Sequence, residues 1–252
     1  MHICQVQTDA IFVLPTGSGK SMLFLLPVML AVNKLAVVII PLVALQEDLM
    51  KRCSHMGIPA SRWKDRHVAG SRIVFCSCEH VETEEYAQFL NETEKTNRLL
   101  SIFVDEVHLL DQWSDFRPVM KRIATKIRAD TKAPVYGLTA TCPPCLQPDI
   151  SRLINVTNPT IIRQSNSRAN LSYEVMKVDE STLLLDVLTI VKKDFEAAQL
   201  MRGNVEDGPY RYIMYCKTRD ECDQYKLIFQ GMQNKFAMHK YHAGMKREER
   251  KI

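Results

Sequence analysis

The sequence predicts an α/β protein whose first domain is a doubly wound parallel sheet. Short apolar runs rich in Val, Ile and Phe recur along the first half of the chain, at residues 10–14, 36–40, 72–76, 101–104 and 135–138. Their residues do not alternate between apolar and polar, as expected of strands that are covered on both faces. Helical or loop segments separate the runs, and parallel strands require such connections.

Each predicted strand is followed directly by a short segment, and most of these segments carry polar side chains. In chain order they are residues 15–21, Pro41 and Leu42, Ser77, Asp105 and Glu106, and residues 139–141. In open parallel sheets, ligands bind at the carboxyl ends of the strands. The sequence therefore predicts that the chemically active side chains gather at one edge of the sheet.

Composition excludes several classes of protein. The 252 residues are 46% hydrophobic and 25% charged, which excludes a disordered chain or a disulfide scaffold. The net charge of +4 permits a nucleic-acid partner without indicating one. Eight cysteines, scattered through apolar segments, are interpreted as thiols of a reducing compartment. The longest apolar run, residues 22–32, is too short to cross a bilayer, and we expect no membrane or export segment.

A polar break at residues 166–170 divides the chain. We expect a first domain at residues 1–164 and a second at 165–252. The second should contain a strand at 171–178, a helix at about 181–200, a strand at 210–216 and a short strand before residue 241. Thr218 and Glu221 form a capping box that predicts another helix. Because the chain stops before this second sheet is complete, we expect a truncated domain.

The Gly-rich segment after the first strand is the strongest local signal. It leads into an apolar helix, the setting in which backbone amides and a helix N-terminus cradle phosphates. Lys20 would reach the β- and γ-phosphates and Ser21 would bind Mg²⁺. The strict pattern has glycine where Leu14 stands, and the alternative is a turn with an exposed lysine. The predicted ATP-binding residues are Thr16, Gly17, Ser18, Gly19, Lys20 and Ser21.

Asp105 and Glu106 follow the fourth strand and suggest a hydrolytic pair. Asp105 would hold Mg²⁺, and Glu106 would polarise the attacking water. Two surface acids at a strand end are common by themselves, but a phosphate loop earlier in the same domain favours the catalytic interpretation.

Three other segments have two interpretations each. Thr139 and Thr141 end a strand with small hydroxyls that can bond to the acid pair or to the backbone. Residues 112–117 carry a Trp and a Phe that stack on bases or anchor a loop in the core. The spacing of Cys142 and Cys145 fits a zinc site, but no second pair stands at ligand spacing, so we expect thiols and no zinc.

Taken together, these segments resemble superfamily-two helicases, and more narrowly the RecQ family of DNA helicases. The matching motifs run in the expected order, at residues 9–21, 38–45, 105–108, 112–118, 137–141, 212–219 and 241–244. Asp105-Glu106-Val107-His108 is similar to the family's DEAH box with Val in place of Ala. Residues 112–118 are similar to the aromatic-rich loop that couples DNA binding to ATP hydrolysis in RecQ enzymes.

The resemblance implies two RecA-like domains, the second incomplete, with ATP and Mg²⁺ as cofactors and single-stranded or duplex DNA as partner. It implies 3′ to 5′ translocation, a place in DNA repair and recombination, and a nuclear location. The catalytic residues would be Lys20, Asp105, Glu106 and His108. Ser21 and Asp105 would bind Mg²⁺. Thr139 and Thr141 would couple ATP hydrolysis to DNA binding. The DNA-binding residues would be Pro41, Leu42, Gln112, Trp113, Phe116, Arg117, Lys217, Arg219 and His242.

The chain also departs from the family pattern. The upstream adenine-reading motif has no room before Pro15, and the motifs with the phosphate-stabilising arginines would lie beyond Ile252. A second hypothesis is therefore a truncated or degenerate module that binds nucleotide and nucleic acid without motor activity. A third, a DEAH-type RNA helicase, is disfavoured by the aromatic loop.

Overall fold

The computed structural model describes residues 8–41, 43–63, 65, 68, 70–112, 122–129, 131–167, 170–179, 182–202, 213–230, 239–242 and 244–245. The chain divides into two compact units, Met1–Asn170 and Leu171–Ile252. Each unit is described by itself.

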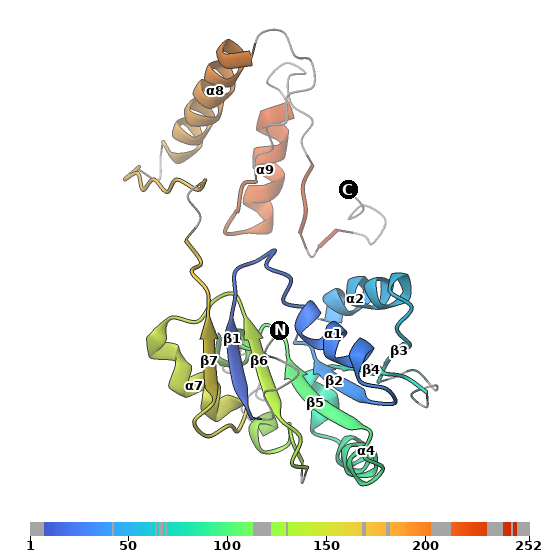
Figure 1. The fold of residues 1–252 in the computed structure, drawn as a ribbon. Helices are drawn as coiled ribbons and strands as arrows, with labels where there is room; N and C mark the ends of the chain where they lie inside the picture. Colours follow the sequence, from blue (N-terminus) through green and yellow to red (C-terminus); the bar gives the residue numbers. More distant parts are fainter. Residues whose placement is uncertain are drawn as a thin grey trace. The chain divides into compact units, whose positions relative to one another are not determined.

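The first unit is built on a seven-stranded sheet in which every pair of neighbours is parallel (Figure 1). Its strands are β1 (Ala10–Val13), β2 (Leu35–Ile39), β3 (Ala60–Arg62), β4 (Ile73–Cys76), β5 (Leu99–Val104), β6 (Val135–Thr139) and β7 (Thr160–Arg163). Their order is β3-β4-β2-β5-β6-β1-β7. The predicted doubly wound parallel sheet is confirmed.

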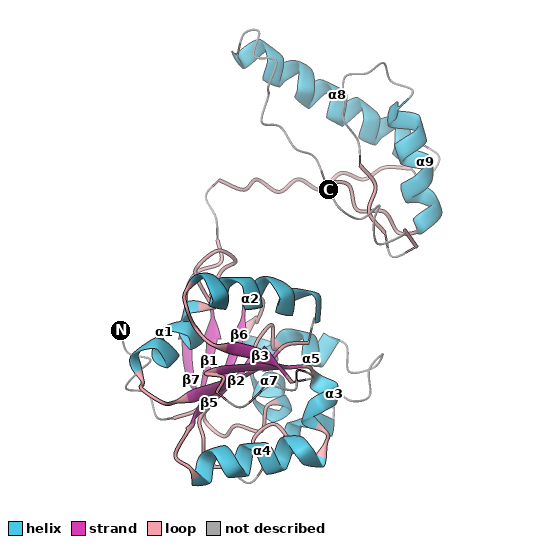
Figure 2. Ribbon diagram, turned by 90° about the vertical axis from the view of Figure 1, so that its right-hand side faces the viewer, coloured by secondary structure: helices cyan, strands magenta, loops and turns pink. Residues whose placement is uncertain are grey.

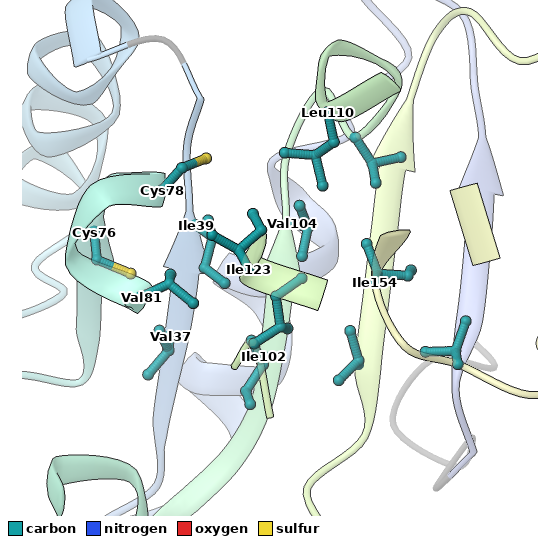
Figure 3. Close-up of a cluster of buried hydrophobic side chains, with 14 of the residues drawn as sticks. Val37, Ile39, Cys76, Cys78, Val81, Ile102, Val104, Leu110, Ile123 and Ile154 are labelled. Carbon is teal, nitrogen blue, oxygen red and sulfur yellow. The ribbon is translucent and has the colours of Figure 1, made fainter. Parts of the chain in front are cut away.

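Helices cover both faces of this sheet (Figure 2). They are α1 (Met22–Leu30), α2 (Val43–His55), α3 (Cys78–Val81), α4 (Glu84–Lys95), α5 (His108–Gln112) and α7 (Gln147–Leu153), with 3₁₀ turns at Ile123–Thr125 and Pro144–Leu146. Successive strand residues point to opposite faces, so one core contains Val37, Ile39 and Val104 (Figure 3) and the other contains Val38 and Phe103. Because both faces are buried, the strands need no polar residues between the apolar ones.

Two edge strands escaped the sequence analysis, because neither has an apolar run. β3 is three residues long, and only its central Ser61 is buried. In β7 the residues are mostly exposed. The acidic stretch at residues 79–94 contributes to the core as well, because α4 buries Tyr86 and Leu90. The Tyr86 hydroxyl donates to the carbonyl oxygen of Ile127 at 2.8 Å.

The second unit contains two described helices, α8 (Leu183–Arg202) and α9 (Arg219–Gln230). The predicted capping box is confirmed, because the Glu221 amide donates to Thr218 Oγ1 at 3.1 Å and the Thr218 amide donates to Glu221 Oε2 at 3.2 Å. The predicted strand at 171–178 is wrong. These residues are exposed and irregular, because no neighbouring strand pairs with them in the described part of this unit. The described residues 213–216 are irregular too, and the second RecA-like domain stays a prediction.

Gly137 on β6 provides a test of how tightly the site is supported. A Cβ at this position would lie 3.2 Å from Ile154 Cδ1 and 3.4 Å from Val107 Cγ1. We expect Gly137→Ala to lower the free energy of unfolding by about 1–3 kcal/mol, because these buried methyl groups must move. Urea denaturation measures the effect. Ile154→Val removes the nearer methyl, so the double variant should lose less stability than the sum of the single variants; simple additivity would contradict the account.

Candidate active site

The Gly-rich loop, residues 15–21, connects β1 to α1 at the carboxyl edge of the sheet. Gly17 and Gly19 have φ angles of 81° and 80°, in the left-handed region that favours glycine. The Ser18 amide donates to the carbonyl oxygen of Pro15 at 3.2 Å, and the Met22 amide donates to that of Gly19 at 2.8 Å. The residues between Thr16 and Gly19 are exposed. The loop therefore presents its backbone to solvent directly before the first turn of an apolar helix.

Lys20 belongs to this loop, and its charge reaches the residues that follow β5. Its Nζ donates to the carbonyl oxygen of Leu14 at 3.4 Å. Its charge also acts on Asp105 and His108. Burial, reinforced by the neighbouring Glu106, raises the pKa of Asp105 to about 6, and Lys20 partly opposes that rise. Burial and the Lys20 charge lower the pKa of His108. The phosphate loop and the acid segment thus lie within electrostatic reach of each other.

The acid segment changes its sheet partner within three residues. The Asp105 amide donates to the carbonyl oxygen of Ile39 on β2, and the Val107 amide donates to that of Leu138 on β6, both at 2.9 Å. Glu106, between them, has a φ of 44°. A left-handed conformation is costly for a residue other than glycine and persists only where neighbouring bonds enforce it. These two backbone bonds enforce it at Glu106.

His108 connects the acid segment to the end of β6. Its Nδ1 lies 3.5 Å from Glu106 Oε2 and 2.9 Å from Thr139 Oγ1. Thr139 Oγ1 accepts from the Thr141 amide at 2.9 Å and donates to the Thr141 carbonyl oxygen at 3.0 Å. The Thr139 hydroxyl has one proton, so with that carbonyl as its acceptor it accepts from His108. With this orientation of the hydroxyl, the His108 ring proton is on Nδ1.

The structure brings some of the predicted site residues together and leaves others apart. Lys20, Asp105, Glu106, His108, Thr139 and Thr141 gather at one edge of the first unit. Pro41 is buried after β2, and Gln112 is exposed at the end of α5. Leu42, Trp113, Phe116 and Arg117 lie outside the described residues.

The remaining predicted DNA-binding residues belong to the second unit. Lys217 and Arg219 are exposed at the start of α9. His242 Nε2 lies 3.3 Å from Asp223 Oδ1, which also accepts from Lys240 Nζ at 2.5 Å. Sequence analysis missed Asp223 and Lys240, because no motif marks them and only the fold of this unit brings them beside His242.

The donor set at the edge fits Mg²⁺ bound together with a nucleotide. Mg²⁺ in such sites takes one or two protein oxygens and completes its shell with phosphate oxygens and water. The Ser21 hydroxyl at the start of α1 and the Asp105 carboxylate are oxygen donors of that kind. Across the described ranges, no three His, Cys, Asp or Glu side chains are grouped to hold a metal by themselves. Cys142 is a buried thiol and Cys145 an exposed one.

The fold is a doubly wound α/β domain with polar side chains gathered at the carboxyl edge of its parallel sheet. The DEAD/DEAH box helicase family matches residues 1–147, more than half of the chain, and the chain belongs to that family. In the described residues, no helix has the length and apolar character needed to span a membrane.

Individual relatives confirm the resemblance to RecQ helicases. The chain is 29% identical to the ATP-dependent helicase SGS1 of Saccharomyces cerevisiae over 96% of its length, and 27% identical to the ATP-dependent DNA helicase RecQ of Haemophilus influenzae over 94%. It spans 17% of the yeast protein and 37% of the bacterial one. The S. cerevisiae Dbp5 structure is similar in fold, with a TM-score of 0.62, 13% identity, and coverage of 96% of this chain and 61% of that one.

The buried carboxyl of Asp105 predicts a pH dependence of stability in the chain without metal or nucleotide. Its folded pKa of about 6 lies above the unfolded value. The folded chain therefore holds a proton that the unfolded chain releases from about pH 4 upward, and the resulting loss of stability is complete above about pH 6. We expect Asp105→Asn to raise the free energy of unfolding by about 1–3 kcal/mol at about pH 8 and by less at about pH 5.

Urea denaturation at the two pH values checks this expectation. Asp48→Asn, on the exposed surface of α2, is the matched control and should change stability by no more than about 0.5 kcal/mol. An Asp105→Asn variant that is less stable than the parent at the higher pH would contradict it.

Proposed function

We propose that this chain is the ATP-hydrolysing part of a RecQ-like DNA helicase that translocates 3′ to 5′ on single-stranded DNA. The observation that carries the proposal is the gathering of Lys20, Asp105, Glu106 and His108 beside a glycine-rich loop at the carboxyl edge of a parallel sheet. In this proposal residues 1–164 form the ATP-binding domain, and residues 165–252 form part of the second RecA-like domain.

Each residue has a distinct part in the proposed hydrolysis. The backbone of residues 16–21 binds the phosphates, and Lys20 neutralises charge that develops on them. Ser21 and Asp105 hold Mg²⁺, which stabilises the charge on the β- and γ-phosphate oxygens when bound. Glu106 orients the attacking water and draws its proton. Because His108 is bonded to Thr139, the position of the Glu106 carboxylate depends on the end of β6.

DNA contacts are assigned to both units. Trp113 and Phe116 would stack on bases, with Gln112 and Arg117 beside them, and Pro41 and Leu42 would lie along the backbone. Lys217, Arg219 and His242 would meet phosphates from the second unit. Asp223 supports this assignment because its carboxylate orients the His242 ring.

The nuclear location and the role in repair and recombination belong to the same proposal, and imaging of a tagged chain tests the location.

The second candidate is a module that binds nucleotide and DNA without turnover. The chain spans 17% of the yeast relative and 37% of the bacterial one. ATP binding with no DNA-stimulated hydrolysis would support this candidate.

Three variants test the motor assignment. Lys20→Ala should weaken nucleotide binding and abolish hydrolysis, because the phosphates lose their cation. Glu106→Gln should keep nucleotide binding and reduce turnover by about 10²–10⁴-fold. Trp113→Ala should keep basal hydrolysis and lose stimulation by single-stranded DNA. Nucleotide affinity and steady-state ATP hydrolysis, with and without DNA, measure these effects.

Lys34→Ala is the matched control for the lysine variant. Lys34 is half-buried just before β2, at the opposite edge of the sheet, where its ammonium is bonded to Asn97. Its loss should therefore leave hydrolysis unchanged. Undiminished DNA-stimulated turnover in all three site variants would contradict the proposal. Stronger stimulation by RNA than by DNA would favour the RNA-helicase alternative.

A further inference from the structure

Four consecutive carbonyl groups at the end of β6 each accept a hydrogen bond. Thr139 O accepts from the Leu14 amide at 2.9 Å, and Thr141 O accepts from the Thr139 hydroxyl at 3.0 Å. The other two accept from side chains: Ala140 O from Asn166 Nδ2 at 2.5 Å, and Cys142 O from Arg163 Nη1 at 2.7 Å. Each of these four peptide units is therefore held by at least one hydrogen bond.

Both side chains come from the stretch of chain that leaves the sheet. Arg163 is the last residue of β7, and the Gln164 amide still donates to the carbonyl oxygen of Val13 on β1 at 2.9 Å. Asn166 follows two residues later, and the second unit begins at Leu171. Residues 163–166 are thus anchored to β1 by their backbone and to residues 140–142 by their side chains.

A continuous line of hydrogen bonds runs from Asn166 to the candidate active site. Asn166 Nδ2 donates to the carbonyl of the peptide unit that joins Ala140 to Thr141, and the N–H of the same peptide unit donates to Thr139 Oγ1. Thr139 Oγ1 in turn pairs with His108 Nδ1. Because one planar peptide unit carries both bonds, a shift of its carbonyl moves its N–H as well.

Arg163 holds the other side of Thr141. Arg163 donates to the carbonyl oxygen of Cys142. The next residue is Pro143, which has no N–H, so this carbonyl is the one hydrogen-bonding group of its peptide unit. Cys142 is buried, and the guanidinium also acts on its thiol, where it opposes the rise in pKa caused by burial. Arg163 is exposed overall, and its guanidinium lies against this segment.

We infer that Arg163 and Asn166 are positioning residues, which fix the 139–142 segment so that the stretch leading to the second unit controls the placement of His108 and Glu106. The inference rests on the proposed function for its consequence in turnover. Loss of the two side-chain bonds alters the Thr139 to His108 bond. The backbone bonds next to the phosphate loop, from the Gln164 amide to Val13 and from the Leu14 amide to Thr139, remain in place. Nucleotide affinity is then independent of these two side chains, and the rate of hydrolysis depends on them.

The test compares Asn166→Asp, which keeps the shape and removes the donor, and Arg163→Ala with the control Arg152→Ala. Arg152 is an arginine of α7 that pairs with Asp149 and does not bond to residues 139–142. We expect the first two variants to lower DNA-stimulated kcat by about 10- to 100-fold, with nucleotide Kd and KM within about twofold of the parent values. Arg163→Lys should recover part of the loss, and Arg152→Ala should show none.

Thr139→Val distinguishes positioning from general support of the fold. If Asn166 acts through the Thr139 hydroxyl, Asn166→Asp should have no further effect on kcat in the Thr139→Val background. Full additivity of the two losses would overturn the inference.

Nuclear magnetic resonance of the His108 ring nitrogens separates this inference from the proposed function. In the chain without nucleotide, the parent should show the ring proton on Nδ1, and Asn166→Asp and Arg163→Ala should shift both ring signals while Arg152→Ala does not. Absence of ATP hydrolysis in the parent would count against the proposed function, and the ring signals would still decide the inference. Unchanged His108 signals in both variants would overturn it.

Discussion

The site depends on the hydrogen bonding at the end of β6. This strand lies between β5 and β1, and its last two carbonyls accept from both sides: Leu138 O from the Val107 amide and Thr139 O from the Leu14 amide. The first bond fixes the acid segment, and the second fixes the entry to the phosphate loop. Because all three strands run parallel, both connections leave at the same edge of the sheet. The proposed hydrolysis requires this alignment of β5, β6 and β1, because it places the acid segment and the phosphate loop beside each other.

Function at this edge costs stability. Glu106 is held in a left-handed conformation, and the Asp105 carboxyl is buried beside another acid. Neither arrangement favours the fold, and both persist because the sheet behind them buries apolar side chains on two faces. Gly137 belongs to the same support, because its missing side chain leaves room for Val107 directly after Glu106.

Sequence patterns predicted the features that depend on residues close together in the chain. The buried strands, the glycine-rich loop and the Thr218 capping box are local signals, and the strands and the box were confirmed. Side-chain partnerships between distant segments were not predictable, since Arg163 and Asn166 carry no motif and meet residues 140–142 only through the pairing of β7 with β1. The strand expected at 171–178 did not form, because a segment with strand-like residues becomes a strand only when another strand pairs with it.

Hydrogen exchange of the backbone, with and without Mg²⁺ and ADP, tests the central claim most directly. If the end of β6 joins the phosphate loop to the acid segment, nucleotide should slow exchange in peptides that cover residues 15–21, 105–108 and 139–142 together. Protection confined to residues 15–21, with the other two segments unchanged, would contradict a site organised through β6.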